Sequence, residues 1–97
     1  DLLILRALLP GRTHGYGIAS RLQQVSDDVL RIGESSLYPA LQRLLLHGWV
    51  KAEWGISENN RRARYYTLTR AGVKQLAAER EEFGRMVEAI QKVLNMA

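Results

Sequence analysis

The chain has 97 residues, no cysteine and a formal net charge of +4, so we expect one small domain whose core has no disulfide to stabilise it. Its most apolar stretch, residues 2–9, contains Arg6 and is far shorter than the ~20 residues of a membrane-spanning helix, which predicts no membrane partner. The stretch also lacks the flanks of a signal peptide, and the absence of cysteine suits a reducing, cytoplasmic location.

The positive charge is concentrated in the first 70 residues. They hold ten Lys and Arg against six Asp and Glu, whereas residues 71–97 hold four of each. The segment 56–70 alone has four arginines and one glutamate. A segment of this kind attracts phosphates and speeds encounter with a polyanion. The alternative is a solvated loop whose charges serve solubility.

The first half of the chain predicts two helices and a short strand. Residues 2–9 form an apolar helix that a Pro-Gly pair ends. Residues 15–26 carry one apolar stripe and predict a second helix, with Thr13 or His14 as its N-cap. After a turn, residues 29–32 are rich in branched side chains and predict a strand that pairs with a later hairpin.

A third helix is predicted over residues 36–47. Ser36 is the expected N-cap, which places Pro39 at the third helical position, where a missing N–H costs nothing. Gly48 is expected to end the helix. The buried stripe comprises Leu37, Ala40, Leu41, Leu44 and Leu45, and the outer surface comprises Ser35, Tyr38, Pro39, Gln42, Arg43 and Leu46.

Two segments with alternating apolar residues, 49–54 and 65–68, predict the strands of a hairpin. The nine residues between them, 55–63, form a long loop, and such length is typical of function or mobility. Trp49 and Trp54 are expected in the core, because the hairpin packs on apolar helices.

The end of the chain, residues 70–96, contains no proline and predicts a helix of about 40 Å that starts after Thr69. A helix of this length must partly protrude, and its apolar residues repeat every seven positions. An exposed stripe of this kind predicts a homodimer. The alternative is that the helix folds back and completes the core of its own domain. The stripe comprises Leu76, Phe83, Met86, Val87, Ile90, Val93 and Leu94.

Helix, strand, basic loop and strand, in this order, are the parts of a winged helix. The predicted fold class is mainly α with a small β-hairpin. It consists of a winged helix-turn-helix DNA-binding domain, residues 1–69, and a long C-terminal dimerisation helix, residues 70–97. A winged helix puts one helix in the major groove of DNA and a loop beside it. Double-stranded DNA is therefore the predicted partner.

The predicted DNA contacts come from three segments. Gln42 suits adenine, and Arg43 suits guanine or phosphate. The loop arginines are expected to grip phosphates or to enter the minor groove. The full set is Ser35, Ser36, Tyr38, Pro39, Gln42 and Arg43 in the third helix, Arg61, Arg62 and Arg64 in the loop, and His14 and Tyr16 at the start of the second helix.

Some of these residues have structural alternatives. Tyr16 and Tyr38 are equally consistent with core aromatics that keep a hydrated hydroxyl. Arg64 can instead pair with Glu53 across the two strands, because opposite charges stabilise such ladders. Asn59 and Asn60 are interpreted as turn residues rather than as readers of bases.

Three stretches resemble the PadR-like transcriptional regulators. They are His-Gly-Tyr-Gly at 14–17, Ser-Leu-Tyr-Pro-Ala-Leu-Gln-Arg-Leu at 36–44 with Gly-Trp at 48–49, and Asn-Arg-Arg-Ala-Arg-Tyr-Tyr-Thr-Leu-Thr-Arg-Ala-Gly at 60–72. The resemblance implies a homodimeric bacterial repressor with an N-terminal winged helix and a C-terminal dimerisation helix, which in many members is released from DNA by a small molecule. A dimer that sets two third helices one DNA turn, ~34 Å, apart predicts a near-palindromic operator. Some drug-sensing relatives hold aromatic ligands between tryptophans of the terminal helices. Trp49 and Trp54 both lie in the predicted hairpin, so the effector and its site stay unassigned.

Catalytic chemistry is not indicated. The Gly15-Tyr-Gly17 segment lacks the third glycine of a dinucleotide loop and follows a helix instead of a strand. The two histidines are 33 residues apart and have no cysteine or suitably spaced carboxylate nearby, which does not suit a zinc site. We therefore predict no enzyme activity, no cofactor and no metal. The alternative function is a winged helix that binds another protein without reading DNA.

Overall fold

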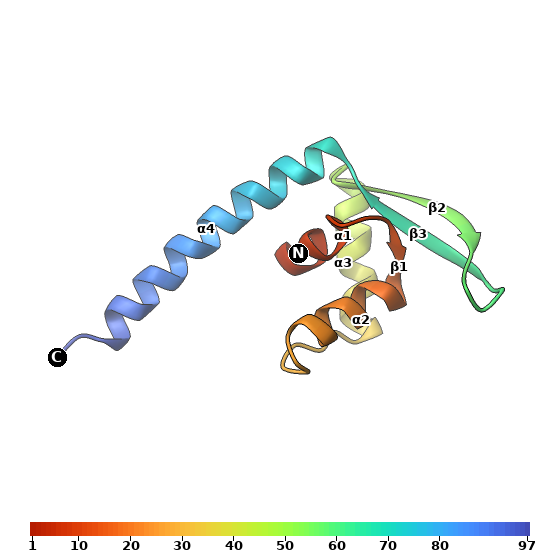
Figure 1. Ribbon diagram of the computed structural model, residues 1–97. Helices are drawn as coiled ribbons and strands as arrows, with labels where there is room; N and C mark the ends of the chain where they lie inside the picture. Colours follow the sequence, from red (N-terminus) through yellow and green to blue (C-terminus); the bar gives the residue numbers. More distant parts are fainter.

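In the computed structural model, residues 1–97 form three helices and a small sheet from which a fourth, long helix projects (Figure 1). The molecule measures 58 × 29 × 23 Å along its principal axes. The elements are α1 (Leu2–Leu8), β1 (Thr13–His14), α2 (Gly15–Val25), α3 (Glu34–Leu46), β2 (Val50–Ile56), β3 (Arg62–Leu68) and α4 (Arg70–Leu94). The predicted fold class, mainly α with a small hairpin and a long C-terminal helix, is confirmed.

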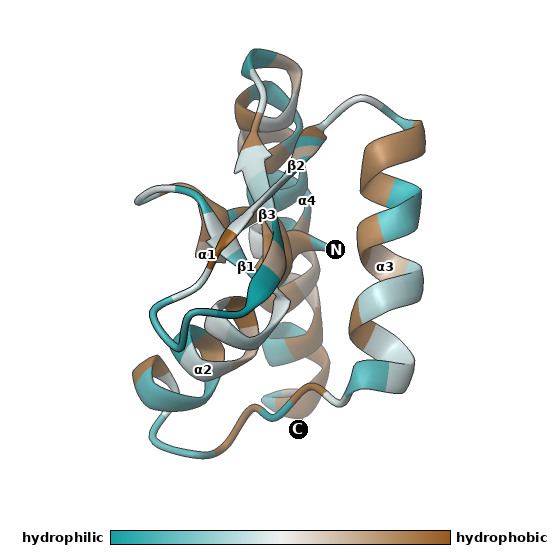
Figure 2. Cartoon of the chain, turned by 90° about the vertical axis from the view of Figure 1, so that its right-hand side faces the viewer, coloured by the Kyte–Doolittle hydropathy of each residue, from teal (hydrophilic) through white to brown (hydrophobic).

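The core lies where α1, α2, α3 and the base of the hairpin meet. Leu5 of α1, Ile18 of α2 and Leu44 of α3 are each fully buried there. Tyr66 of β3 and Leu76 of α4 close the same cluster. Figure 2 shows α3 standing beside the hairpin, with hydrophobic and hydrophilic residues alternating along its length. The predicted apolar stripe of α3 faces the core, because four of its five residues are buried and the fifth, Leu45, packs against them.

Leu41 illustrates how strongly this small core depends on each side chain. It is 1% exposed and belongs to the single cluster of twelve buried apolar residues. Replacement of such a leucine by alanine typically costs about 2 to 5 kcal/mol, which is a large share of the stability of a small domain.

The third strand of the sheet is not where the sequence predicts it. Residues 29–32 form no strand, and β1 instead pairs with β3 through Thr13 opposite Tyr66 and His14 opposite Tyr65. The sheet order is β1-β3-β2. After α2, Asp27 and Asp28 take left-handed φ values of 51° and 68°, and the Ser26 hydroxyl accepts a hydrogen bond from the backbone N–H of Leu30. This local turn leads the chain directly into α3 and away from the sheet.

Helix α3 begins two residues earlier than its predicted cap. The N-cap is Gly33, and Glu34 occupies the first turn, where the helix dipole favours a negative charge. The predicted cap, Ser36, is therefore a helical residue, and Pro39 lies at the sixth position instead of the third. Pro39 cannot donate to the carbonyl of Ser35, but Ser35 is exposed, so water can satisfy that oxygen.

The predicted end of α3 is confirmed in detail. Gly48 has a φ of 74°, the left-handed conformation that favours glycine after a helix. Its N–H donates to the carbonyl of Leu45, and the N–H of Trp49 donates to the carbonyl of Leu44. These two bonds form a Schellman motif, which turns the chain sharply into β2.

The β2–β3 hairpin is longer than predicted and its loop is shorter. The ladder runs from Val50 opposite Leu68 to Ile56 opposite Arg62, so only residues 57–61 form the loop. The Ser57 N–H donates to the carbonyl of Arg61 at 2.7 Å and closes the turn. The prediction of a nine-residue loop is wrong, because the cross-strand pairs carry the ladder past the core. Arg62, which the prediction places in the loop, is therefore a strand residue, as is Arg64 just beyond the predicted loop.

Helix α4 starts with a clear cap and soon leaves the core. The Thr69 hydroxyl accepts a hydrogen bond from the N–H of Gly72 and donates one to the carbonyl of Gly48. A Cβ on Gly72 would collide with the Trp49 carbonyl oxygen, which explains the glycine at this junction. None of the helices combines the length and the apolar character needed to cross a membrane.

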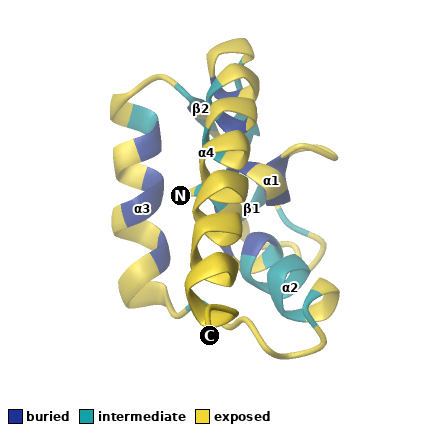
Figure 3. Cartoon of the chain, turned by 90° about the vertical axis from the view of Figure 1, so that its left-hand side faces the viewer, coloured by how far each residue is buried: buried dark blue, intermediate teal, exposed yellow.

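The C-terminal half of α4 does not fold back onto its own domain. Every residue from Glu81 to the end of the chain is exposed (Figure 3). The fold-back alternative is therefore wrong for this part of the helix. Leu76 differs from the rest of the predicted stripe, because it is 5% exposed and packs in the core of its own domain.

Candidate nucleic-acid interface

One groove lies between the hairpin, the start of α2 and the outer side of α3. It has a volume of about 740 Å³. Seven of the predicted DNA contacts line it, namely His14, Tyr16, Tyr38, Gln42, Arg61, Arg62 and Arg64. Residues that are far apart in the sequence thus meet on one surface, as the prediction of a composite DNA site requires.

The α2 side of the groove is held by a histidine cap. The Nδ1 atom of His14 accepts a hydrogen bond from the N–H of Gly17 at 3.0 Å, as expected for an N-cap. The α2 start also fits closely against α3, because a Cβ on Gly15 would lie 2.9 Å from the Tyr38 hydroxyl oxygen. Tyr16 is 78% exposed and Tyr38 is 45% exposed. Neither tyrosine is a core residue, so both rings remain available on the groove.

The outer face of α3 divides into two flanks. Ser35, Ser36 and Pro39 are exposed but do not line the groove. Gln42 lies on the flank that faces the hairpin. Arg43, one residue on, is turned by about 100° around the helix axis. It faces α1, where its guanidinium binds the Asp1 carboxylate at 2.9 Å.

The inner face of the hairpin carries paired aromatic and arginine residues. The guanidinium of Arg62 lies 4.4 Å from the ring centroid of Trp54, and that of Arg64 lies 5.9 Å from the ring centroid of Tyr66. Neither arginine has an ion pair with a carboxylate, because the structure contains only three such pairs, all elsewhere. Their positive charges therefore remain available to an anionic partner.

Two predictions about the hairpin residues are wrong for the same geometric reason. Trp54 stands opposite Arg64 in the ladder, and Glu53 stands opposite Tyr65. Glu53 and Arg64 consequently project from opposite faces of the hairpin and do not pair. Trp54 is 60% exposed because the core beneath the hairpin ends before its position. Trp49 packs against the core, as predicted.

Tyr66 forms the floor of the groove where the hairpin meets the core. It is almost fully buried, and this burial raises the pKa of its phenol above the ordinary value near 10. The positive charge of Arg64 partly opposes that rise in pKa. The phenol is therefore neutral at physiological pH, and it adds no negative charge to a groove that would meet phosphates.

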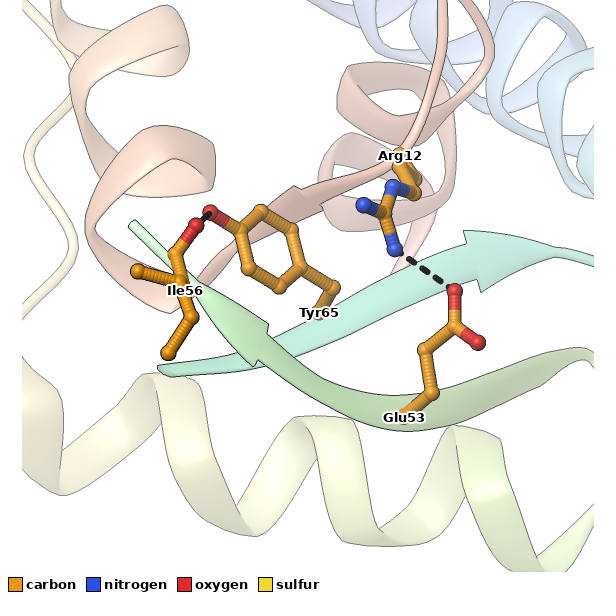
Figure 4. A network of polar contacts seen from close by, with 4 residues as sticks. All are labelled: Arg12, Glu53, Ile56 and Tyr65. Atoms are coloured by element: carbon orange, nitrogen blue, oxygen red, sulfur yellow. Dashed lines mark hydrogen bonds and ion pairs between the residues drawn. The ribbon is translucent and has the colours of Figure 1, made fainter. Parts of the chain in front are cut away.

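One set of contacts on the outer face of the hairpin was not predicted from the sequence. Arg12, in the loop before β1, binds the Glu53 carboxylate at 2.6 Å and lies 4.5 Å from the ring centroid of Tyr65 (Figure 4). The Tyr65 hydroxyl donates a hydrogen bond to the carbonyl of Ile56 at 3.1 Å (Figure 4). These contacts tie both strands to the α1–β1 loop. The strand alternation places Glu53 and Tyr65 on one face, but nothing in the sequence identifies Arg12 as their partner.

Comparison with known proteins gives one family. The sequence profile of the transcriptional regulator PadR-like family matches residues 4–78. The structure of a transcriptional regulator from Clostridium thermocellum is 33% identical, with a TM-score of 0.86 over 95% of this chain and 89% of that chain. A PadR family transcription regulator from a hypervirulent Clostridium difficile strain is 27% identical, with a TM-score of 0.81 over 98% and 97% of the two chains.

A third similar structure contains nucleic acid. Bacillus subtilis PadR in complex with operator DNA is 27% identical, with a TM-score of 0.69 over 79% of this chain. This chain spans 42% of the length of that protein. The similarity covers the greater part of this chain, and the larger part of the Bacillus protein has no counterpart in it.

Proposed function

The chain belongs to the PadR-like family of transcriptional regulators, and we propose that it represses transcription by binding operator DNA as a homodimer. Its similar structures are of regulators, which confirms the prediction that it is not an enzyme. The observation that carries the proposal is the groove on which the start of α2, Gln42 of α3 and three unpaired hairpin arginines converge. A regulator of this kind acts beside the chromosome, in keeping with the expected cytoplasmic location.

In the proposed complex, α3 enters the major groove with its outer face toward the bases. Gln42 can donate to and accept from the edge of an adenine, the pairing that its amide suits. Ser35 and Ser36 lie in the first turn of the helix, where the positive end of the helix dipole favours phosphate. Pro39, one turn further on, would contact the DNA backbone through its exposed ring only. Tyr38 and the α2 start, with His14 and Tyr16, would contact the backbone on the hairpin side.

The hairpin would supply most of the electrostatic attraction. Arg61 lies in the loop, and Arg62 and Arg64 follow on β3. Arg62 and Arg64 share one face of the strand and are separated by about 6.7 Å along it. Both therefore face the same stretch of DNA backbone. Arg43 pairs with Asp1 in the free chain and does not line this groove. That pair is exposed and therefore weak, so DNA can displace it, and Arg43 stays a proposed contact to guanine or phosphate.

The projecting half of α4 is the proposed dimer interface. Its apolar side chains are between 39% and 70% exposed, which is too much apolar surface for a helix that has no partner. An apolar pocket of about 380 Å³, lined by Leu3, Leu30, Ile32 and Phe83 among others, adjoins this stripe. A second copy would cover both surfaces. The interface residues on α4 are Phe83, Met86, Val87, Ile90, Val93 and Leu94.

A two-fold dimer predicts the form of the operator. Two copies of α3 in successive major grooves would be separated by about 34 Å, one turn of DNA. The operator would then be a near-palindrome with two equivalent half-sites. The Bacillus subtilis neighbour, solved with operator DNA, supports this use of the fold.

Selection of bound fragments from random duplex DNA tests the proposal directly. We expect enrichment of an inverted repeat whose half-sites are about one helical turn apart. Light scattering on the same protein should give twice the 11.0 kDa mass of one chain. The protein-binding alternative would be favoured by two results together. The selection would enrich no sequence, and reversal of the charges of Arg61 and Arg62 would leave capture of a protein partner intact.

A further inference from the structure

Trp54 is the residue whose position is least explained by the fold. It is 60% exposed on the inner face of the hairpin, although tryptophan is usually one of the more buried side chains. It does not join the core, and its ring instead lies against the guanidinium of Arg62 at 4.4 Å. An exposed indole at this place contributes little to the stability of the domain.

The strand register explains how this pair forms. Trp54 stands opposite Arg64, and the next pair on the same face is Ile56 opposite Arg62. Arg62 is therefore the diagonal neighbour of Trp54, within reach of a long side chain. No carboxylate pairs with Arg62, so the indole is its principal partner.

The contact with the indole ring leaves the N–H donors of Arg62 available to bind phosphate. The N–H donors of a guanidinium lie in its plane, so an aromatic ring over one face leaves them able to bind oxygen atoms. A free arginine on a strand must give up rotamer freedom before it grips a phosphate, and that loss weakens binding. An arginine already held over a ring has given up much of this freedom.

We propose that Trp54 is a positioning residue that holds Arg62 in its DNA-gripping conformation, directed into the groove between the hairpin and α3. Both residues line that groove. This inference rests on the proposed function and adds a residue that carries no charge of its own. A positioning role makes a distinctive prediction, because the number of phosphate contacts stays the same when the indole is removed.

The test measures binding to a fluorescein-labelled duplex of mixed sequence by anisotropy at several salt concentrations, since phosphate contacts need no particular sequence. The proteins are the wild type, Trp54→Ala, Trp54→Phe, Arg62→Ala and the double variant of both alanine changes. Circular dichroism on each variant checks folding, which the exposure of both side chains predicts to be retained. The control background is Arg61→Ala, because Arg61 carries the same charge but has no ring beneath it.

Trp54→Ala should weaken binding about two- to fivefold per protomer, the range expected for an exposed cation–π pair, and thus about 4- to 25-fold for the dimer, with an unchanged salt slope. Trp54→Phe should retain part of the affinity, because phenylalanine keeps a ring face. Arg62→Ala should reduce the magnitude of the salt slope by about two per dimer. Trp54→Ala should then have no further effect in the Arg62→Ala background and its full effect in the Arg61→Ala background.

Equal effects of Trp54→Ala in all three backgrounds would overturn the positioning role, as would no effect in the wild type. In either case, normal binding by the wild type would leave the proposed function intact. If the wild type itself showed no salt-dependent binding to the duplex, the proposed function would fail, and the inference with it.

Discussion

The hairpin arginines give the sharpest test of the proposed DNA interface. The perturbation is Arg62→Gln together with Arg64→Gln, which removes two charges per protomer and keeps a polar side chain at each position. Both arginines line the groove and neither has a carboxylate partner that the change would leave unpaired. The variant should therefore fold normally and differ from the wild type in its attraction to phosphate.

The expected size of the effect follows from counterion release. Each phosphate contact contributes about 0.9 to the slope of log K against log salt concentration, so four contacts per dimer contribute about 3.6. Over about a fourfold rise in salt concentration, these contacts alone account for about a 150-fold loss of affinity. The variant should lose this part of the salt dependence and bind more weakly at low salt.

The matched control is Arg85→Gln together with Lys92→Gln, which removes the same charge from α4. Both residues are exposed on the projecting helix, away from the groove. Arg85 pairs with Glu81, but both side chains are largely exposed, so loss of that pair costs little stability. If only the total charge mattered, the two double variants would have the same salt slope in anisotropy titrations. That equality would refute the argument that the hairpin grips phosphate, whereas a flatter slope for the hairpin variant alone would support it.

Three further predictions concern the dimer, the bases and the core. Ile90→Glu puts a charge into the exposed apolar stripe of α4, so light scattering should give a monomer of 11.0 kDa and operator binding should be greatly weakened. The control Glu88→Gln should keep both the dimer and operator binding. Gln42→Ala should reduce discrimination at one base pair per half-site by about 1 to 3 kcal/mol without a change in salt slope, measured on single-substituted operators; an unchanged preference would exclude base reading by Gln42. Because burial raises the pKa of Tyr66 in the folded chain, the unfolded chain loses this proton first as pH rises. The free energy of unfolding should therefore be highest below about pH 10 and fall as pH rises through the folded pKa, and urea titrations of Tyr66→Phe should lack this loss, unlike those of Tyr16→Phe.

The helices and their ends were predictable because their signals are local. Each of these signals acts within one or two turns of the chain. They are the apolar stripe of α3, the N-cap at Thr69 and Gly48 at the end of α3. The error at Ser36 was local too, since Ser36 is an attractive cap and Gly33 offers no side chain to identify it. The start of a helix is thus less certain from sequence than its apolar face.

The features that the sequence did not reveal depend on contacts between distant residues. Strand β1 has only two residues, and only the neighbouring β3 makes it a strand. The length of the β2–β3 ladder depends on pairing past the core, where burial no longer provides an alternating pattern. The ion pair of Arg43 with Asp1 joins residues 42 positions apart. None of these could be inferred from spacing along the chain.

In the proposed complex, the two flanks of α3 would divide electrostatic attraction to DNA from recognition of its bases. On the hairpin side, Gln42 is the one α3 amide in the groove, and the arginines around it would contact phosphate without reading sequence. On the other side, Arg43 is the one further side chain that could read a base, and it would first have to leave its exposed pair with Asp1. A single protomer would therefore bind DNA readily but discriminate weakly between sequences. Duplication of this reading surface through the proposed α4 dimer would double the base contacts and fix their separation, so sequence specificity would depend on the dimer more than on any one side chain.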